Sequence, residues 1–327
     1  MSSHPLPIRR PGQVVVCGSI AFDNIMDYPG SFRDHILADK AHVINISFLV
    51  EQFKRQQGGC APNIAYSLAL LGERARIVGT AGTDFGDYRD WLVGQGVDVE
   101  AVGIVPGEMT ATCFITTDRA DCQITGFFPG AMGKARDLCL AELAGPEASV
   151  AIVAPDDPEA MLRHCQEARA MGLPFFFDAS FQVTALDGEP LARAADGALG
   201  LFLNDYEFSV FQQKTGKTAD QIRAEHELLV ITYGEKGSEI LLRDGSTIQV
   251  SASKVGKAVD PTGAGDAYRG GFLAGLMKGL SLEICARMGS IAAVYCIECY
   301  GTQCHAYTRQ EFLERYRATY GADLALD

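Results

Sequence analysis

The chain has 327 residues, 47% of them hydrophobic, and a formal net charge of −13 at pH 7. It is long enough to bury a substantial core, either as one large α/β domain or as a domain with a small appendage. The acidic charge argues against binding to a nucleic-acid backbone, and no run of about 18 apolar residues is available to span a membrane.

The N-terminus and the cysteines indicate the compartment. No apolar signal core follows Met1, so we expect a cytoplasmic protein. Ten cysteines are spread along the chain, and we interpret them as reduced thiols in the core. Cys296, Cys299 and Cys304, with His305, could bind zinc, but they lie in a predicted helix and its following loop without a second cysteine pair. Packing is therefore the better interpretation of this group.

The first predicted strand is the buried apolar run Val14–Gly18. Ser19 and Asp23 follow it. In an open parallel sheet, ligands bind beyond the carboxyl ends of the strands, so Asp23 lies where a substrate would bind. An aspartate just after a strand is also a common loop or capping residue, and its position alone does not decide between the two.

Two regions, residues 24–57 and about 107–130, contain strands with one polar face. Their alternating pieces are His42–Leu49, Ala111–Thr117 and Gln123–Phe128. Because the other predicted strands are apolar throughout, we expect these pieces to form a small β lid over the main sheet. Phe127 would then present an exposed ring near the cleft.

The run Gly58–Gly72 predicts a helix with glycine at both ends. The paired Gly58 and Gly59 permit close approach of the backbone to a ligand. Asn63, in the first turn, could direct its amide to the same place or could simply be a polar residue at a helix start.

The rest of the chain alternates short apolar strands with helices. The predicted strands are Ala75–Gly79, Val97–Val99, Val150–Val153, Pro174–Asp178 and Leu199–Leu203. This alternation is typical of an α/β fold with a parallel sheet.

Two further motifs follow predicted strands. Asn204 is a good helix N-cap, and Glu207 would complete a capping box, which is an adequate structural explanation for both residues. Thr232, Gly234 and Gly237 follow a buried strand in the pattern Thr-x-Gly-x-x-Gly, which also fits an ordinary glycine-rich turn.

The stretch Asp-Pro-Thr-Gly-Ala-Gly-Asp, residues 260–266, is a turn that feeds a helix predicted to run to about Lys278. Free N–H groups at residues 263–265 and the helix dipole make such a turn an anion site. A carboxylate there, Asp266, would repel the anion unless it performs chemistry, and the natural role is general base. The alternative is an acid that merely caps the helix.

Two familiar phosphate-binding motifs do not fit this chain. The sequence contains no G-x-x-x-x-G-K-[ST], which excludes a Walker-type loop. Tyr268 stands at the third glycine of G-x-G-x-x-G, which disfavours a dinucleotide fold.

The turn resembles the C-terminal signature of the PfkB (ribokinase-like) sugar and nucleoside kinases, and related motifs extend from Gly18 to Gln303. The resemblance implies one kinase domain over residues 1–327. Its fold would be α/β, with a ribokinase-like, mostly parallel central sheet flanked by helices and a small β lid. It also implies that Asp266 deprotonates the acceptor hydroxyl and that the amides of Gly263, Ala264 and Gly265 form an anion hole for the transferred phosphoryl.

The same resemblance implies roles for the other motifs. Asp23 would hold two sugar hydroxyls, with Ser19, Gly59 and Asn63 in the same substrate site. The residues implied for ATP and Mg²⁺ are Asn204, Glu207, Thr232, Gly234 and Gly237. In many relatives the residue corresponding to Asp260 and the loop after the last core helix supply oxygens to a monovalent cation such as K⁺.

Several stretches, such as Phe127–Met132, are similar to bacterial adenosine kinases in particular. The predicted reaction is therefore ATP-dependent phosphorylation of the 5′-hydroxyl of adenosine to AMP. Phe127 and Phe181 would stack on the purine and Gln182 would contact its edge. Packing between lid and core explains these three residues equally well.

Alternatives to adenosine remain open, because the sequence departs from those adenosine kinases at Cys113 and at Phe181-Gln182. A ribokinase- or fructokinase-like sugar kinase, or a nucleoside kinase of broader specificity, would use the same Asp266, Asp23 and Asn63. A non-catalytic binding protein is disfavoured by the intact turn. Exposed edges of the lid favour pairing of two subunits into a homodimer.

Overall fold

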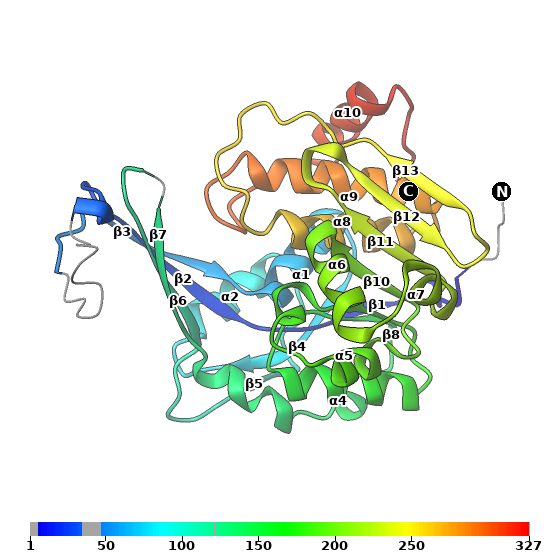
Figure 1. Cartoon of the computed structure of the whole chain (residues 1–327), viewed down its shortest axis with the longest axis horizontal. Helices are drawn as coiled ribbons and strands as arrows, with labels where there is room; N and C mark the ends of the chain where they lie inside the picture. The colour runs from blue at the N-terminus through cyan, green and yellow to red at the C-terminus, as the bar shows by residue number, and fades with distance from the viewer. Residues whose placement is uncertain (1–5, 35–46, 121, 327) are drawn as a thin grey trace.

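The computed structural model describes residues 6–34, 47–120 and 122–326 (Figure 1). Within these residues, nine strands form one large sheet in the order β13-β12-β11-β10-β9-β8-β1-β4-β5. The strands are β1 (Gln13–Cys17), β4 (Ala75–Ala81), β5 (Val102–Ile104), β8 (Ala148–Val153), β9 (Phe175–Asp178), β10 (Gly200–Asn204), β11 (Leu228–Thr232), β12 (Ser238–Leu242) and β13 (Thr247–Val250). All pairings from β5 to β11 are parallel, and β12 and β13 add an antiparallel edge.

Helices cover both faces of this sheet, as expected when parallel strands are apolar throughout. One core cluster joins the sheet to α1 (Cys60–Leu70), α2 (Gly86–Gly94), α8 (Ala264–Met277), α9 (Leu282–Ile297) and α10 (Arg309–Tyr320). The other joins it to α3 (Leu140–Leu143), α4 (Pro158–Ala170), α5 (Gly188–Ala195), α6 (Asp205–Thr215) and α7 (Ala219–Glu225). Short 3₁₀ helices lie at Phe32–Asp34, Gly130–Asp137, Ser180–Val183 and Gly234–Lys236.

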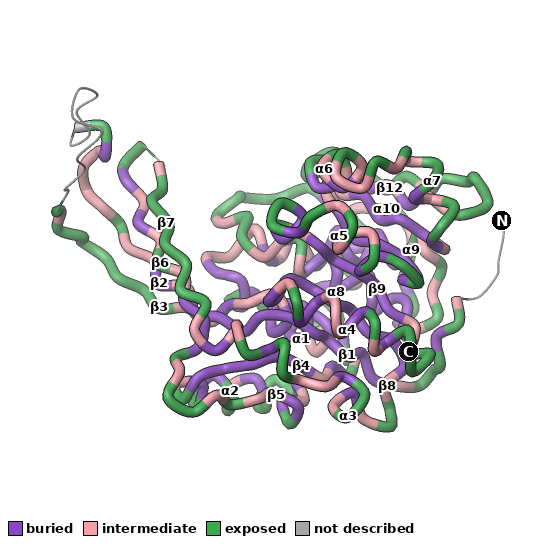
Figure 2. The backbone as a smooth tube through the Cα atoms, turned by 60° about the horizontal axis from the view of Figure 1, so that its bottom comes forward, coloured by how far each residue is buried: buried purple, intermediate pink, exposed green. Residues whose placement is uncertain are grey.

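A second sheet of four strands projects from one side of the core (Figure 1). Its order is β3 (Gln52–Gly58), β2 (Ala21–Asp27), β6 (Ala111–Thr117) and β7 (Gln123–Phe128). Figure 2 shows the contrast in burial: buried backbone fills the core, whereas β3 and β7 are exposed along most of their length.

Of the strands of this small sheet, β6 and β7 lie within the lid segment predicted at about 107–130, whereas β2 begins at Ala21, before the segment predicted at 24–57, and β3 ends one residue beyond it. Of the predicted strand at His42–Leu49, residues 42–46 lie outside the described residues, as does the rest of 35–46. Residues 47–49 have no strand structure.

The predicted α/β fold, with a mostly parallel sheet between two layers of helices, is confirmed. The predicted strand at Val97–Val99 is wrong, because the structure has only an isolated bridge at Asp98 and the strand begins at Val102. Asp98 explains the shift, since its Oδ1 accepts from the Glu100 N–H and thereby turns the backbone out of the ladder.

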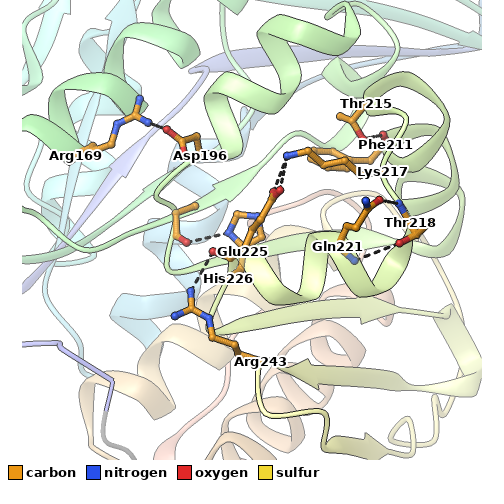
Figure 3. A network of polar contacts seen from close by, with 11 residues as sticks. Arg169, Asp196, Phe211, Thr215, Lys217, Thr218, Gln221, Glu225, His226 and Arg243 are labelled. Carbon is orange, nitrogen blue, oxygen red and sulfur yellow. Dashed lines mark hydrogen bonds and ion pairs between the residues drawn. The ribbon is translucent and has the colours of Figure 1, made fainter.

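Polar contacts secure the entry to β11 at the amino ends of the strands (Figure 3). Thr218 and Gln221 form a capping box that starts α7, and Lys217 pairs with Glu225 at its end. His226 Nδ1 lies 3.0 Å from the carbonyl oxygen of Ala198. This network is structural, because a ligand site is expected at the opposite ends of the strands.

No helix in the described part of the chain is long and apolar enough to cross a membrane. All ten cysteines are free thiols. Cys296, from the candidate zinc group, donates its thiol to the carbonyl of Thr262 at 3.4 Å, and no cluster of three or more metal-binding side chains was found among the described residues.

Candidate active site

The carboxyl ends of the central strands and the start of α8 surround a cavity of about 540 Å³, which we call the Asp266 cavity. It lies where the parallel-sheet rule places a ligand. Eight of the predicted site residues line it: Phe181, Asn204, Glu207, Thr232, Gly234, Gly263, Gly265 and Asp266.

The turn before α8 has the geometry of an anion site. Gly263 is the N-cap in a left-handed conformation, with φ 77°, and a Cβ on it would lie 2.9 Å from the side chain of Thr302. The Ala264 N–H donates to the carbonyl oxygen of Pro261 at 3.2 Å, so this one of the three amides predicted for the anion hole is bonded to the backbone. The N–H of Gly265 lies in the first turn of the helix, where amides lack an intrahelical acceptor.

Asp266 is held by a chain of hydrogen bonds that starts far away in the sequence. Asn63 Nδ2 donates to Asp266 Oδ2 at 2.8 Å. Gln303 Nε2 in turn donates to Asn63 Oδ1 at 2.7 Å and to the hydroxyl of Tyr88 at 2.6 Å. The contact between Asn63 and Asp266 brings the two predicted residues together and fixes the orientation of the carboxylate.

Burial raises the pKa of the Asp266 carboxyl to about 6. The positive charge of Arg269 and the hydrogen bond from Asn63 act in the opposite direction, and the charge of Glu207 adds to the rise. A carboxylate with this pKa is ionised at pH 7 and still basic enough to accept a proton from a reacting hydroxyl.

Arg269 and Asp178 form a buried ion pair under the cavity that the sequence did not reveal as part of the site. Arg269 Nη2 donates to Asp178 Oδ1 at 2.6 Å, and its Nε pairs with Oδ2. Burial raises the pKa of Asp178 to about 7, and the guanidinium opposes that rise. The signal that could have identified the pair is an arginine three positions after Asp266, because the residues that follow it in α8 are all small or apolar and give its charge no partner.

Asp23 lies on β2, at the junction of the small sheet with the core. Its carboxylate lies over Gly58, where a Cβ would lie only 2.6 Å from Oδ2. Burial, followed by the negative charge of Asp260, raises the pKa of Asp23 to about 6.

The start of α1 completes this junction. Gly59 has φ 95°, and a Cβ there would lie 2.5 Å from the carbonyl oxygen of Ser19. Only glycine therefore allows α1 to begin so close to the end of β1. Ser19 Oγ accepts from the N–H of Cys60 at 3.4 Å, so Ser19, Gly59 and Asn63 share one corner of the site.

Asn204 and Glu207 form the capping box at the start of α6. The Glu207 N–H donates to Asn204 Oδ1 and the Asn204 N–H donates to Glu207 Oε2, both at 2.8 Å. Both residues also line the Asp266 cavity, so the structural role and a ligand-binding role are compatible.

A second cavity of about 690 Å³, the Tyr268 cavity, adjoins the first. The two cavities share Thr232, Gly234 and Gly265, and the second also contains Gly237. Small and apolar side chains line much of it, including those of Ala293, Val294 and Ile297. A ligand with a flat apolar group and a polar tail could thus extend from one cavity into the other.

The three residues predicted to bind a purine lie in different environments. Phe127 is 50% exposed on β7 and lies beside Cys113, which lies beside Asp23, so these side chains share one face of the small sheet. Phe181 is 57% exposed at the Asp266 cavity. Gln182 is buried, and its Nε2 donates to the carbonyl of Asp156 at 2.7 Å, which commits that amide nitrogen to the backbone.

Asp260 connects the turn to the loop after α9. Its Oδ1 accepts from the Thr262 N–H at 2.9 Å and its Oδ2 from the Gly301 N–H at 3.1 Å. The carboxylate therefore holds the two segments predicted to surround a monovalent cation next to each other.

Comparison with known proteins identifies relatives over nearly the whole chain. A family model described as pfkB family carbohydrate kinase matches residues 22–308. A nucleoside kinase from Methanothermobacter thermautotrophicus is 32% identical over 280 residues, which are 85% of this chain and 90% of the relative. A cytidine kinase from Thermococcus kodakarensis is 30% identical over 71% of this chain and 84% of its own length.

Solved structures of a nucleoside kinase are also similar to this chain over nearly its whole length. The structure of a Burkholderia thailandensis nucleoside kinase in complex with inosine is similar, with a TM-score of 0.85 and 39% identity, over 95% of this chain and 99% of that one. A structure of that kinase in complex with ADP-inosine matches with a TM-score of 0.83 and 40% identity, over 95% of this chain and 97% of that one.

Proposed function

The chain belongs to the PfkB family of carbohydrate kinases, and on this basis we propose that it transfers a phosphoryl group from ATP to the 5′-hydroxyl of adenosine, giving AMP. The observation that carries the proposal is the ionisable Asp266 oriented by Asn63 beside the free amide of Gly265. That arrangement places a base for the acceptor hydroxyl and an anion site for the transferred phosphoryl group within one turn of helix. Phosphoryl transfer uses both.

In the proposed reaction, Asp266 accepts the proton of the 5′-hydroxyl as its oxygen bonds to the γ-phosphorus. The bond between that phosphorus and the bridging oxygen breaks, and ADP leaves with the electron pair. Asn63 keeps the carboxylate aimed at the hydroxyl, and the amides of Gly263 and Gly265 stabilise the charge on the transferred oxygens. The proton remains on Asp266 until it is released to water.

ATP with Mg²⁺ is the proposed phosphoryl donor. Mg²⁺ is usually held by one or two carboxylates together with substrate phosphates, and Glu207 and Asp205 supply such carboxylates at the Asp266 cavity. When bound, the ion would neutralise phosphate charge.

The Tyr268 cavity would take the adenine of ATP, with Thr232, Gly234 and Gly237 along its edge. K⁺ is proposed near Asp260, which lies against the loop after α9.

The small sheet supports a nucleoside rather than a free sugar as the acceptor. Asp23 presents a carboxylate suited to two ribose hydroxyls, and Phe127 extends the same face outward with a half-exposed ring. A free sugar would leave that ring without a partner. Phe181, at the neighbouring cavity, is the proposed second ring. Gln182 would reach the purine edge only through its carbonyl oxygen, because its nitrogen is bonded to Asp156.

We expect specificity for adenosine to exceed that for ribose by about 10²-fold or more, because stacking contributes roughly 1–3 kcal/mol per aromatic face. Phe127→Ala should raise the KM for adenosine and leave any weak ribose activity unchanged. Initial rates with adenosine, inosine, cytidine, ribose and fructose test this expectation. The matched control is Thr125→Ala, two residues away on the same face of β7, which should change neither rate.

Inosine is the second candidate acceptor, because the similar Burkholderia kinase was solved with it. If inosine exceeds adenosine, the purine assignment holds and the exocyclic amine is not recognised. Higher specificity for ribose or fructose would refute the nucleoside assignment but leave phosphoryl transfer intact.

The small sheet is also the proposed lid of a single kinase domain and its proposed dimer interface. The face opposite Asp23 exposes four apolar side chains by 45–62%: Phe53, Phe114, Ile124 and Phe128. Their register places them on one side of the sheet. Burial of this face against the same face of a second copy would remove it from water.

We expect light scattering to give the mass of a dimer for the wild type. Phe114→Glu should give a monomer with an unchanged circular dichroism spectrum, since its side chain is already half-exposed in the single chain. A wild type that is monomeric at micromolar concentration would contradict the interface.

A further inference from the structure

The Asp266 cavity has an unusual charge distribution for a site that must hold phosphates. Its lining includes the carboxylates of Asp205, Glu207 and Asp266. Among the described residues that line it, the single cationic side chain is that of Arg269. In a protein with a net charge of −13, this guanidinium is the positive charge that the described lining of the Asp266 cavity offers to a phosphoryl group.

The position of Arg269 on α8 directs it to the anion site. Side chains on a helix slope toward its N-terminus, and Arg269 is four residues after Gly265 and three after Asp266. A Cβ on Gly265 would lie 2.7 Å from Nη1 of Arg269. This nitrogen therefore lies directly against the backbone of the residue whose amide lines the anion hole.

The other two nitrogens of the Arg269 guanidinium are held by a buried carboxylate. Nε and Nη2 both pair with Asp178, which is completely buried at the end of β9, and the ring of Phe202 lies 5.7 Å from Cζ. Two of the three nitrogens thus serve as an anchor. The third nitrogen, Nη1, is the one that lies against Gly265, and both residues line the Asp266 cavity. An anchored guanidinium loses little freedom when Nη1 binds a ligand.

Burial lowers the pKa of Arg269, but the carboxylates of Asp178, Asp266 and Glu207 more than reverse this effect and raise it. The side chain is therefore permanently charged. Its positive charge also lowers the pKa of Asp266, against the rise that burial causes. Arg269 can act on both partners of the reaction, the base and the phosphoryl group.

We propose that Arg269 is a catalytic residue whose Nη1 donates a hydrogen bond to an oxygen of the transferred phosphoryl group, and that Asp178 is its positioning residue. The inference rests on the proposed kinase reaction but not on which hydroxyl is the acceptor. As the bond from phosphorus to ADP breaks and the bond to the acceptor oxygen forms, Arg269 keeps its protons and stabilises the charge on the equatorial oxygens. Asp266 alone takes the acceptor proton.

The first test is Arg269→Lys, because lysine keeps the charge but cannot bond Asp178 and a phosphoryl oxygen at once. We expect kcat to fall by about 10²–10³-fold, as for loss of one preorganised donor, with the KM for the acceptor changed only a few-fold. Affinity for ADP with aluminium fluoride, which mimics the transferred group, should fall by a similar factor, while affinity for ADP alone stays the same. Arg76→Lys, which alters a partly buried ion pair outside the site, is the matched control and should leave both unchanged.

Removal of one member of a buried ion pair can prevent folding, so a second variant replaces both. Arg269→Met combined with Asp178→Asn leaves no unpaired buried charge, and circular dichroism and an unfolding curve establish that it folds. We expect it to be as slow as Arg269→Lys. Guanidinium chloride at about millimolar concentration should restore part of the turnover of Arg269→Ala, because the ion can occupy the empty position beside Asp178.

The pH profile separates a catalytic from a merely structural role. The charged groups around Arg269 are Asp178 on β9, Glu207 on α6 and Asp266 on α8. The double variant Arg269→Met with Asp178→Asn loses the positive charge of Arg269. The pKa of Asp266 should therefore rise, and the acid limb of kcat should move to higher pH. A folded double variant with turnover close to wild type, or with both KM values raised and kcat unchanged, would overturn the proposal. All rates are measured with the best acceptor of the wild type, so that a wild type inactive toward every acceptor would refute the kinase function instead.

Discussion

Asp266→Asn is expected to reduce turnover by roughly 10² or more while both substrates still bind, because the variant loses a positioned general base and little else. In the wild type, the amide of Asn63 donates to Asp266 Oδ2 at 2.8 Å. In the variant it could donate equally well to the side-chain carbonyl oxygen of the new asparagine. The Gly265 amide is untouched. Single-turnover kinetics and calorimetric titration with each substrate measure the two effects separately.

The variant should be at least as stable as the wild type at pH 7. Burial raises the pKa of Asp266 to about 6 in the folded protein, above its unfolded value, so the ionised carboxylate destabilises the fold once the pH exceeds about 6. Replacing it with a neutral amide removes that cost. Asp220→Asn, which removes one negative charge from the first turn of α7, outside both cavities, is the control, and we expect it to leave kcat unchanged. Near-normal turnover of Asp266→Asn would remove Asp266 from the role of base.

The pH dependence of the wild type follows from the same pKa values. Asp266 acts only when ionised, so kcat should be lost as the pH falls through about 6. Asp23 also has its pKa raised to about 6, and it must be ionised to receive the acceptor. We therefore expect the acid limb of kcat/KM, which reports the free enzyme, to be steeper than that of kcat.

Much of the fold could be predicted because the relevant signals are local. An uninterrupted apolar run such as Val14–Gly18 can only be buried on both faces, which requires helices on both sides of a parallel sheet. The turn before α8 is likewise encoded by adjacent small residues, and the capping box of Asn204 and Glu207 spans one turn of helix. Prediction was wrong at Val97–Val99, where one side-chain contact of Asp98 moved the strand.

The remaining parts of the site could not be predicted, because they depend on contacts between distant segments. Arg269 and Asp178 are separated by 91 positions, and Gln303 and Asn63 by 240. No pattern in the sequence states that these side chains meet. For Gln182 the sequence suggested a contact that the structure only partly allows. Its amide was predicted to contact the purine, but its nitrogen donates to the backbone carbonyl of Asp156.

Asp23→Ala is expected to weaken binding of the nucleoside by about 3–6 kcal/mol, or about 10²–10⁴-fold, because charge-assisted hydrogen bonds contribute about 1.5–3 kcal/mol each and two are proposed. The affinity for ATP should barely change, since Asp23 lines neither the Asp266 cavity nor the Tyr268 cavity. Calorimetric titration with adenosine and with a non-hydrolysable ATP analogue tests both statements. Asp23→Asn should lose less affinity than Asp23→Ala, because an amide still bonds one hydroxyl without the charge.

A folding defect would also weaken nucleoside binding, and the electrostatics of Asp23 make the two explanations distinguishable. Burial and the charge of Asp260 raise the pKa of Asp23 to about 6, above its unfolded value, so at pH 7 the ionised side chain destabilises the ligand-free protein. Its removal should therefore leave the unfolding temperature unchanged or raise it. Asp27→Ala, four residues further along the same face of β2, serves as the control and should keep full affinity. An equal loss of affinity for nucleoside and ATP, together with a lower unfolding temperature, would mean that Asp23 supports the fold and does not hold the ribose.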